Sequence, residues 1–542
     1  QAEDGIRDVE RSRGLGDVYK RQAFKPFGID DQYGRELNFP ECYHNRLTRE
    51  QGIFSMRSRF NAFGLHAIAH NLDGVPVTVL EYPTLERFKQ ELKKGYDYLG
   101  IGFFICNFPK IKKMVEEARA VAPKTKIILG GYGAQIENLE SLVDVDYICI
   151  GEGISFMRRL LGLPEEFKFK NPDIVHWQIQ FMGVPIFWAR NPQVITGLGC
   201  YYRCDFCHPC FFFGQKYHPL IADGKELFQE TLRVKRRFRS TNIGFLGDDN
   251  FLLDLKRAER FWEVAVKEEE LFEIFIFGSA DRIIKFGVEK LAEMGIGSIW
   301  IGRESKFSNY RKNQDQNLKE IIEELHKYGI KVTLSSILFF DFHTPENIWE
   351  DIDDHIAHRP DFSMLSVQAA FPGTPLYERL KEEGRLLKEI PYEEWHGLKY
   401  IWYLHPHFHL SEVPKIRQKA VLKEYHQLGP SALRYIQTEL KGYKYLKNST
   451  RPILRKRAEF YKNRSLRSRV ILLAMEKLVP TKEMREMVRE TRREFEAEFG
   501  KSTPVDWALA GGLIAFGKKQ ELKMKYFGDV IQPSTKVYHY NY

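Results

Sequence analysis

Residues 196–207 read Thr-Gly-Leu-Gly-Cys-Tyr-Tyr-Arg-Cys-Asp-Phe-Cys, and they place Cys200, Cys204 and Cys207 in one short loop. Three thiolates delivered from one loop can hold three irons of a cubane iron–sulfur cluster, which leaves the fourth iron open. Structural zinc usually takes two separated pairs of Cys or His, and no second pair follows this loop. A zinc loop or plain buried thiols are therefore the alternatives to a cluster.

The spacing Cys-x3-Cys-x2-Cys, with the aromatic Phe206 before the last cysteine, resembles the signature of radical S-adenosylmethionine (SAM) enzymes. The resemblance implies a [4Fe-4S] cluster on Cys200, Cys204 and Cys207, with SAM bound to the open iron through its amino and carboxylate groups. It also implies that one electron from the cluster cleaves SAM to a 5′-deoxyadenosyl radical. A flavodoxin or ferredoxin is then the implied electron donor.

Length and composition are typical of a soluble globular protein. The 542 residues are too many for one compact core and predict roughly two to four domains. Seven cysteines, three of them clustered, argue against a disulfide scaffold and for a reducing compartment. We find no secretory signal, and the longest apolar run, residues 507–516, is too short for a membrane span. We therefore expect a cytoplasmic protein.

The first 62 residues carry little pattern. Residues 1–22 are polar and charged without a hydrophobic period, which favours a disordered or non-native leader. Residues 23–62 contain scattered aromatic residues together with Cys42 and His44. An irregular N-terminal extension is the favoured interpretation of this segment.

Between residues 63 and 163, short apolar strands alternate with helical patterns, which predicts an open parallel α/β sheet. We expect helices at 63–72, 84–94 and 110–121 and strands at 75–80, 98–104, 126–131 and 147–150. Ligands bind such sheets at the carboxyl ends of the strands, where glycines allow a large planar ligand to approach the backbone. The residues expected there are Asn107, Gly130, Gly131, Gly151, Glu152 and Gly153.

This segment resembles the cobalamin-binding domain that precedes the catalytic domain in one large class of radical SAM enzymes. The resemblance lies in the strand at 96–102, the Leu-Gly-Gly turn at 129–131 and the Gly-Glu-Gly turn at 151–153. It implies cobalamin as a cofactor, held at the strand ends just named. The Asp-x-His-x-x-Gly motif, whose histidine ligates cobalt in many cobalamin proteins, is absent, and some members of the class lack it. A Rossmann-like domain that only packs on the next domain is the alternative.

After a connection at 164–189, residues 190–393 alternate six more times between strand and helix patterns. The expected strands lie at 193–195, 242–246, 272–280, 298–305, 331–338 and 362–368. Six parallel strands with outer helices predict a partial barrel rather than a closed eight-stranded one. Polar residues gather near the carboxyl ends of these strands, among them Asp248, Asp249, Asn250, Ser279, Arg282, Glu304 and Ser336.

The same resemblance implies roles for these polar residues. Glu304 and its neighbours are expected to contact the methionyl amine or the ribose of SAM, and Asp248 and Asp249 to line the SAM side. Phe206, Asn250, Ser279, Arg282 and Ser336 complete the expected cofactor-binding set.

Two further residues are candidates for catalysis. Arg303 stands where the family usually has Ile, so it either points a cation into the pocket or pairs with a neighbouring carboxylate. Cys210 follows the cluster loop and is either a substrate-side thiol or radical quencher, or a small packed cysteine.

The C-terminal region, 394–542, is expected to be helical and basic. His405, His407 and His409 form either a metal cluster or a loop that caps the barrel. Residues 441–470 contain eleven Lys or Arg against one acid, Glu459, with interleaved aromatic residues. Such a run suits an anionic membrane surface or nucleic-acid phosphates, and a solvated charged face is the alternative. We expect no nucleic-acid partner and treat 441–479 as a candidate peripheral membrane contact.

The sequence as a whole predicts a radical SAM enzyme that abstracts hydrogen from an unactivated C–H bond. With cobalamin, the expected outcome is C-methylation of a small lipid, isoprenoid or other hydrophobic substrate. Without it, the same scaffold would carry out radical coupling, rearrangement or oxidation. An RNA-modifying enzyme and a non-catalytic cobalamin or metal sensor are the remaining alternatives.

Overall fold

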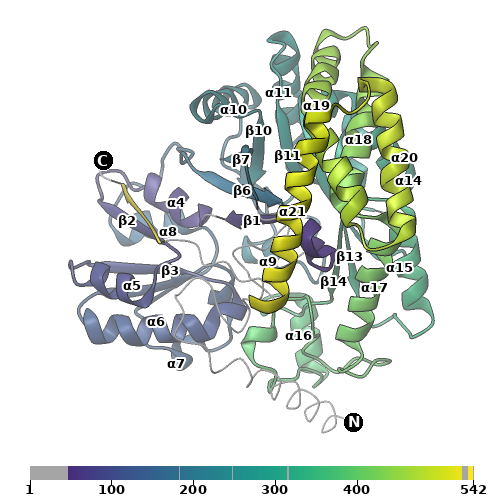
Figure 1. Ribbon diagram of the computed structural model, residues 1–542. Coiled ribbons are helices and arrows are strands. Elements are labelled where there is room, and N and C mark those ends of the chain that lie inside the picture. Colours follow the sequence, from purple (N-terminus) through teal and green to yellow (C-terminus); the bar gives the residue numbers. More distant parts are fainter. Residues whose placement is uncertain are drawn as a thin grey trace.

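The computed structural model describes residues 47–60, 62–181, 184–246, 248–313, 316–527 and 535–540. The expected leader at 1–22 and most of the extension at 23–62, including Cys42 and His44, lie outside these ranges. Figure 1 shows a smaller α/β unit, formed by the N-terminal part of the chain, beside a larger unit with a layer of long C-terminal helices.

The larger unit is built on one sheet of eight strands in the order β1-β6-β7-β10-β11-β12-β13-β14. Every neighbouring pair from β7 to β14 is parallel, so the six strands expected from the sequence form the partial barrel. The strands are β1 (Arg57–Phe60), β6 (Val175–Phe181), β7 (Val184–Ile195), β10 (Asn242–Leu246), β11 (Glu273–Gly278), β12 (Ile296–Glu304), β13 (Lys331–Leu338) and β14 (Phe362–Val367).

The connection expected at 164–189 contains two strand segments that lengthen this sheet. Strand β6 and the start of β7 pair antiparallel, and β1 pairs antiparallel with β6 at the sheet edge. The alternation of apolar and polar residues over 175–181 is the period-2 pattern that predicts a strand.

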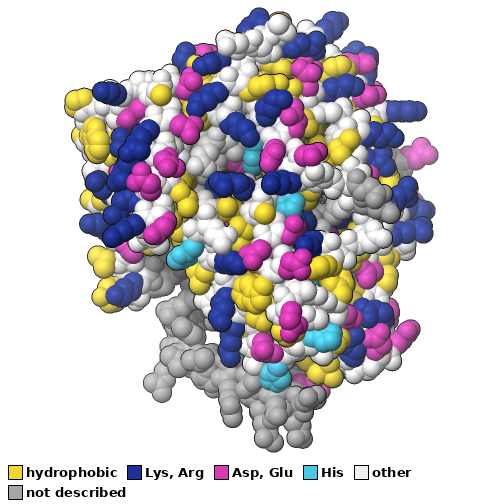
Figure 2. All heavy atoms as spheres, turned by 90° about the vertical axis from the view of Figure 1, so that its right-hand side faces the viewer, with side chains coloured by type: hydrophobic (Ala, Val, Ile, Leu, Met, Phe, Trp, Pro, Cys, Tyr) yellow, Lys and Arg dark blue, Asp and Glu magenta, His cyan; other side chains and the backbone are white. Residues whose placement is uncertain are grey.

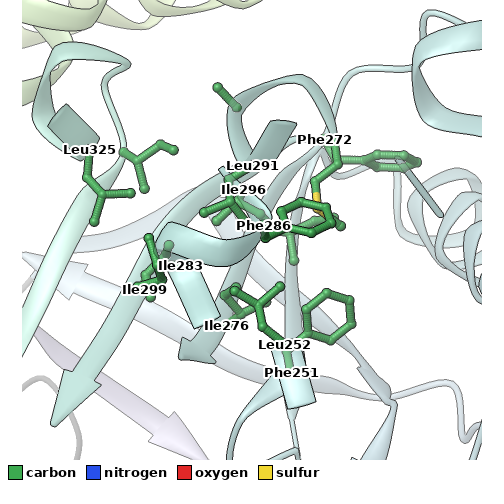
Figure 3. Close-up of a cluster of buried hydrophobic side chains, with 14 of the residues drawn as sticks. Phe251, Leu252, Phe272, Ile276, Ile283, Phe286, Leu291, Ile296, Ile299 and Leu325 are labelled. Atoms are coloured by element: carbon green, nitrogen blue, oxygen red, sulfur yellow. The ribbon is translucent and has the colours of Figure 1, made fainter. Parts of the chain in front are cut away.

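Helices cover one face of the parallel strands and bury alternate strand residues. These helices are α10 (Gly224–Phe238), α11 (Leu255–Lys267), α12 (Ala280–Phe286), α13 (Val288–Glu293), α14 (Leu318–Lys327) and α15 (Asn347–Ala357). Ile276 and Ile299 point into this layer and are fully buried with Ile283, Leu291 and Leu325 of the helices. Figure 3 shows these side chains meeting between sheet and helices. Burial of each such side chain stabilises the fold by about 1.5–3 kcal/mol.

The smaller unit contains a three-stranded parallel sheet in the order β3-β4-β5. Its strands are β3 (Tyr98–Gly102), β4 (Lys126–Gly130) and β5 (Tyr147–Cys149), with helices α4 (Phe63–His70), α5 (Leu85–Leu92), α6 (Phe108–Val121) and α8 (Gly153–Leu160) around them. Strand β2 (Val77–Glu81), expected as a member of this parallel sheet, instead pairs antiparallel with β15 (Lys536–Tyr540).

Strand β15 corrects the expectation that residues 394–542 are helical throughout. It returns the end of the chain to the smaller unit, where Tyr540 shares a hydrogen bond of 2.6 Å with the buried His66. Nε2 of His66 lies 3.1 Å from Oε1 of Glu81 on β2. The two paired strands are more than 450 residues apart, and no local pattern predicts a partner at that separation.

In the described part of the chain after residue 394, the helices are α17 (Val413–Leu428), α18 (Ser431–Leu446), α19 (Pro452–Leu478), α20 (Lys482–Phe499) and α21 (Pro504–Phe527). Within the described ranges, none of the helices is both long and apolar enough to cross a membrane.

Most of the basic run at 441–470 is paired with carboxylates. Lys444 and Lys447 contact Glu494 and Glu498 of α20, each at 2.8 Å. Lys456 contacts Glu269 beside the barrel at 2.6 Å, and Arg457 is fully buried. Figure 2 shows the side of the molecule on the right of Figure 1, where Lys and Arg side chains alternate with Asp and Glu. These charges therefore attach helices to one another and to the barrel.

A buried charge network closes the amino end of the barrel. Nζ of Lys331 on β13 donates to the carboxylates of Glu273 on β11 and Glu439 on α18. Arg457 and Arg464 of α19 add contacts of 3.3 Å to Glu273 and Glu439 respectively. Because buried charges are costly unless paired, this network fixes how α18 and α19 sit on the strands.

Glu439 makes the stability of this junction dependent on pH. Burial raises the pKa of its carboxyl group to about 7, because Lys331 offsets only part of the desolvation and the Glu273 carboxylate adds to it. Between the ordinary value of 4.5 and about 7, the folded chain holds this proton and the unfolded chain has released it. We expect the free energy of unfolding to fall as pH rises through this window, by about 1.4 kcal/mol per pH unit.

The substitution Glu439→Gln should remove this part of the pH dependence, because the amide does not titrate. Urea unfolding near pH 5 and near pH 7 measures the difference. The matched control is Glu494→Gln, which removes an exposed carboxylate of α20 and should leave the difference as it is. An unchanged pH difference in Glu439→Gln would contradict the prediction.

Candidate functional site

The three-cysteine loop leaves the carboxyl end of β7 and leads into α9 (His208–Phe212). Cys200 and Cys204 are buried and Cys207 is half-buried. The loop turns at Gly199, whose φ of 76° and contact with the Lys216 carbonyl leave no room for a side chain. It turns again at Arg203, with a φ of 57°. Left-handed backbone at a non-glycine residue is costly, so the surrounding contacts hold the loop in this shape.

Asp248, directly after β10, is the main anchor of the loop. Its buried Oδ2 accepts hydrogen bonds from Oγ1 of Thr196 at 2.7 Å, Nη2 of Arg257 at 2.8 Å and the hydroxyl of Tyr217 at 2.9 Å. Nη1 of Arg257 also donates to the carbonyl of Thr196 at 3.0 Å. The sequence placed Asp248 here but missed Arg257, because nothing in a helical pattern marks one arginine as buried.

Asp249 holds the next turn of the loop. Its Oδ2 accepts a hydrogen bond of 3.1 Å from the backbone N–H of Gly199, immediately before Cys200. Burial, with Asp248 beside it, raises the pKa of Asp249 to about 7. The two expected aspartates therefore position the cysteines.

A second hydrogen-bond chain joins the ends of β10 and β11 to the loop. Nδ2 of Asn250 donates to Ser279 at 2.8 Å, and Ser279 donates to Asp281 at 2.5 Å. Tyr202 of the loop donates to Asp281 at 2.5 Å, and Nε of Arg282 donates to the Tyr202 hydroxyl at 3.1 Å. The structure thus brings Asn250, Ser279 and Arg282 together with the cysteine loop, as the sequence predicts from the strand ends.

Three buried oxygen atoms at these strand ends have no hydrogen-bond partner within the described part of the chain. They are Oδ1 of Asp248, Oδ1 of Asn250 and Oδ1 of Asn313. A buried acceptor without a donor costs about 1–3 kcal/mol. Ammonium or hydroxyl donors of a bound ligand would satisfy these atoms.

Glu304 ends β12 in a left-handed conformation, with a φ of 64°, where the pairing of β12 with β13 shifts register. The shift turns its carboxylate toward the ammonium group of the half-buried Lys312, with which it forms an ion pair. Burial alone would lower the pKa of Lys312, but Glu304 and the nearby Cys204 raise it. Lys312 lies in an irregular loop with no sequence pattern, and sequence reasoning did not find it.

Phe206 packs on the far side of the same loop. Its ring meets Tyr310 edge-on at 5.2 Å, and Tyr310 donates a hydrogen bond of 2.7 Å to Asp205. The aromatic residue before the last cysteine therefore fixes the loop against the segment that carries Lys312.

Arg303 and Ser336 lie on the opposite, helix-covered face of the sheet, the face of Ile299 and Ile301. Arg303 is buried and contacts Asp351 and Asp354 of α15, each at 2.6 Å. It also donates to Ser336 at 2.8 Å. Of the two expectations for Arg303, the ion pair is the one present, and both residues fix α15 on the strands.

Cys210, His405 and His409 are held within the fold, whereas His407 is exposed. Sγ of Cys210, which is buried, donates to the carbonyl of Cys200 at 3.1 Å. His405 donates to the carbonyl of Phe340 at 2.9 Å, while His409 lies 2.7 Å from the Ser411 hydroxyl. Among the residues that the structure describes, no group of three His, Cys, Asp or Glu is arranged to hold a single metal ion.

The smaller unit meets the cysteine loop at His208, the residue after Cys207. Nε2 of His208 donates to Oε1 of Gln135 at 2.7 Å, and its ring lies 4.9 Å from Tyr132 and stacks on Phe371 at 5.0 Å. Burial lowers the pKa of His208 to about 4, so the imidazole is neutral. The carboxyl end of β4 therefore faces the cysteines directly.

Several strand-end residues of the smaller unit have roles in its own fold. A side chain at Gly131 would lie 2.9 Å from the Phe103 carbonyl, and one at Gly153 would meet Ile68. The Glu152 carboxylate caps α8 by accepting hydrogen bonds from the backbone of Ile154 and Ser155. Gly151 has a φ of 91°, a side chain at Gly130 would make only ordinary contact with Cys149, and Asn107 precedes α6.

Two large apolar side chains stay exposed at the same edge of the smaller unit. Phe104 follows β3 and Ile150 follows β5, and Phe104 lies 5.8 Å from the ring of Tyr132. Exposed apolar groups gathered at strand ends mark a binding surface.

The face of the barrel sheet turned away from the helices is rich in aromatic residues. Phe275, Phe277 and Trp300 are half-buried there, with the rings of Phe277 and Trp300 5.5 Å apart. Nε1 of Trp300 donates to Ser335 at 3.1 Å. The buried amide of Gln193 on β7 has no hydrogen-bond partner for either atom within the described ranges.

The fold and the loop define an α/β protein with a Rossmann-like unit on a six-stranded partial barrel. A solved structure with this fold is the radical S-adenosylmethionine methyltransferase TsrM from Kitasatospora setae, bound to tryptophan and a SAM analogue. It matches with a TM-score of 0.51 and 14% identity, over 74% of this chain and 96% of that chain. The fold expected from the sequence is confirmed by this likeness.

No family model matches the sequence. The bacteriochlorophyllide d C-12(1)-methyltransferase of Chlorobaculum tepidum is 25% identical over 227 residues, or 39% of this chain and 47% of that protein. The hopanoid C-2 methylase of Rhodopseudomonas palustris is 24% identical over 204 residues, or 35% of this chain and 38% of that protein. The chain thus spans about half the length, or less, of these two curated relatives.

Proposed function

We propose that this chain is a radical SAM enzyme that transfers a methyl group to an unactivated carbon of a hydrophobic substrate. The observation that carries the proposal is the position of Cys200, Cys204 and Cys207 at the carboxyl end of β7, in a loop held by Asp248 and Asp249. The names of two curated relatives, both methyltransferases or methylases, support the reaction class.

The cysteine loop suits an iron–sulfur cluster. The three sulfurs come from one loop whose shape is fixed by buried hydrogen bonds, so the ligands are preorganised. When bound, the cluster supplies SAM with the electron that yields the radical for hydrogen abstraction. Burial raises the pKa of Cys200 to about 12 and of Cys204 to about 11, and coordination to a metal deprotonates such thiols.

The strand ends around the loop suit SAM. The three oxygens without donors, on Asp248, Asn250 and Asn313, offer acceptors for its ammonium group and ribose hydroxyls. The Glu304 carboxylate, held by Lys312, adds a fixed negative charge beside them. These groups would orient SAM and exclude water from its sulfonium end.

Cobalamin, the methyl carrier in this proposal, would lie against the exposed edge of the smaller unit. Phe104 and Ile150 offer apolar surface for a large ring, and the edge faces the cysteine loop through Tyr132 and His208. The sequence has no Asp-x-His-x-x-Gly motif. We therefore infer that cobalamin would bind without a cobalt ligand from such a histidine.

A hydrophobic substrate is favoured by the aromatic face of the barrel sheet. Phe275, Phe277 and Trp300 form an apolar surface on the side of the strands that the helices leave uncovered. The buried amide of Gln193 would be satisfied by one polar group of the substrate, such as a hydroxyl or carbonyl.

The test is anaerobic reconstitution followed by counts of iron, sulfide and cobalamin, and by product analysis after reduction. 5′-Deoxyadenosine together with S-adenosylhomocysteine supports methylation. 5′-Deoxyadenosine alone assigns radical coupling, rearrangement or oxidation instead. A protein that contains zinc without iron, or that leaves SAM intact, would overturn the proposal.

Removal of the Trp300 indole is expected to weaken substrate binding while SAM cleavage stays. With methyl-labelled SAM and a total lipid extract as the probe, Trp300→Ala should lower labelled organic-soluble product about tenfold, as loss of roughly 1.4 kcal/mol of aromatic contact predicts. 5′-Deoxyadenosine formation should change less than twofold. The control is Trp262→Ala, which removes an indole from the outer helix α11. Equal loss of product in both variants would contradict a substrate role for Trp300.

A further inference from the structure

Helix α21 concentrates exposed apolar side chains. Five of its large apolar residues are 49 to 69% exposed: Val505, Trp507, Leu509, Leu522 and Tyr526. The helix packs on α19 and contacts the 3-10 helix η2 (Arg49–Phe54), so one side is covered by the protein. Leu522 and Tyr526 are four residues apart and therefore share a face, whereas Trp507 and Leu509, two residues apart, point to opposite sides of the helix. Figure 1 shows α21 crossing the front of the molecule.

The second half of α21 adds positive charge to this exposed surface. Lys518, Lys519, Lys523 and Lys525 are all exposed, against a single acid, Glu521, in the same stretch. Nζ of Lys525 lies 5.6 Å from the ring centre of Tyr526. A helix that lies on the surface of a globular protein and carries Trp, Tyr and Leu beside lysines has the composition of an interfacial membrane helix.

The basic run at 441–470 does not compete for the same role. Lys444, Lys447 and Lys456 are paired with carboxylates of α20 and of the barrel, and Arg457 is buried. The apolar residues of α18 and α19 pack inward, among them Leu446, Ile453 and Tyr461. Sequence reasoning pointed to 441–479 for membrane contact, whereas the accessible combination of lysine and large apolar side chains lies on α21.

We propose that α21 holds the protein on the surface of an anionic lipid bilayer. Leu522 and Tyr526, which share one exposed face of the helix, would enter the boundary between headgroups and acyl chains, and the lysines would lie against anionic headgroups. Charge complementarity favours an anionic bilayer over a neutral one. The inference goes beyond the proposed function, because it concerns where the enzyme works and leaves the cysteine site unchanged.

The test is co-sedimentation of the full chain with two kinds of vesicle, one of phosphatidylcholine alone and one that also contains phosphatidylglycerol. We expect binding to the anionic vesicles only, weakened by salt. The double variant Leu522→Glu with Tyr526→Glu should lose at least about tenfold in vesicle affinity, because it places charge where apolar side chains enter the bilayer. Lys518→Gln with Lys519→Gln should weaken binding and flatten its salt dependence.

The matched control is Lys456→Gln with Lys462→Gln, which removes two charges from the basic run on α19. It should bind vesicles as the unchanged protein does. Equal urea midpoints for all variants would show that a change in vesicle binding does not come from unfolding. Unchanged SAM cleavage without vesicles would show that the variants leave the proposed function intact.

Three outcomes would overturn the inference. They are no binding of the unchanged protein to anionic vesicles, binding retained by the α21 double variant, or loss of binding in the α19 control. Analytical ultracentrifugation adds a fourth. A dimer of the unchanged protein that becomes monomeric in the Leu522/Tyr526 variant would assign this face to a second copy of the chain.

Discussion

Replacement of Cys204 by alanine is expected to abolish both iron binding and SAM cleavage. Each cysteine of the loop would hold its own iron, so the loss of one leaves two ligands, too few to retain a cubane cluster. Cys204 is buried in a loop fixed by Asp248 and Asp249, and Cys210, the next cysteine after the loop, is already hydrogen-bonded to the Cys200 carbonyl.

The measurements are iron and sulfide content and the electron paramagnetic resonance signal after reduction. Iron should fall from about four per chain to a small fraction of one, and 5′-deoxyadenosine to background. The controls are Cys149→Ser, a buried cysteine at the end of β5, and Cys210→Ser beside the loop. Both should retain iron. Full iron in Cys204→Ala, or loss of iron in Cys149→Ser, would contradict the assignment of the loop.

Replacement of Arg257 by methionine is expected to produce the largest loss of stability. It leaves the fully buried carboxylate of Asp248 without its cation, and breaking a buried ion pair in this way costs about 3–5 kcal/mol. Thr196 also loses the hydrogen bond to its carbonyl, so the start of the cysteine loop is released. We therefore expect a lower urea midpoint together with incomplete iron loading.

The matched control is Arg260→Met on the same helix. Arg260 is exposed and contacts Glu263 three residues on, so its loss should change stability by less than about 0.5 kcal/mol. The double variant Asp248→Asn with Arg257→Met should regain part of the stability, because it removes the unpaired charge. A midpoint for Arg257→Met equal to that of Arg260→Met would contradict the role of the buried pair.

Periodicity predicted the barrel, because each strand carries a run of aliphatic or aromatic residues and each following helix has one apolar face. Because each apolar run ends where its strand ends, the same periodicity predicted that polar residues such as Asp248 and Glu304 lie at the strand ends. Period 2 also accounts for Arg303 and Glu304 facing opposite sides of β12. It could not predict the partner of either side chain, Asp351 and Asp354 of α15 for Arg303 and Lys312 for Glu304.

The pattern of charges along the sequence was the least informative guide to which residues lie on the surface. The run at 441–470 resembles a basic surface in sequence, but its partners Glu494, Glu498 and Glu269 lie on other elements. Conversely, the apolar half of α21 was read only as too short to span a membrane, and its exposure depends on what packs against it.

The sequence by itself determined the spacing of the three cysteines, the order of strands and helices in the barrel, and the polar residues that follow its strands. These are local properties, set by side-chain periodicity and backbone conformation. The tertiary structure decided the rest: the burial of Arg257 against Asp248, the Lys312–Glu304 pair, the contact of His208 with Gln135 and the return of β15 to β2. Each depends on segments far apart in the chain, whose energy comes from burial and pairing that exist only once the units have packed together.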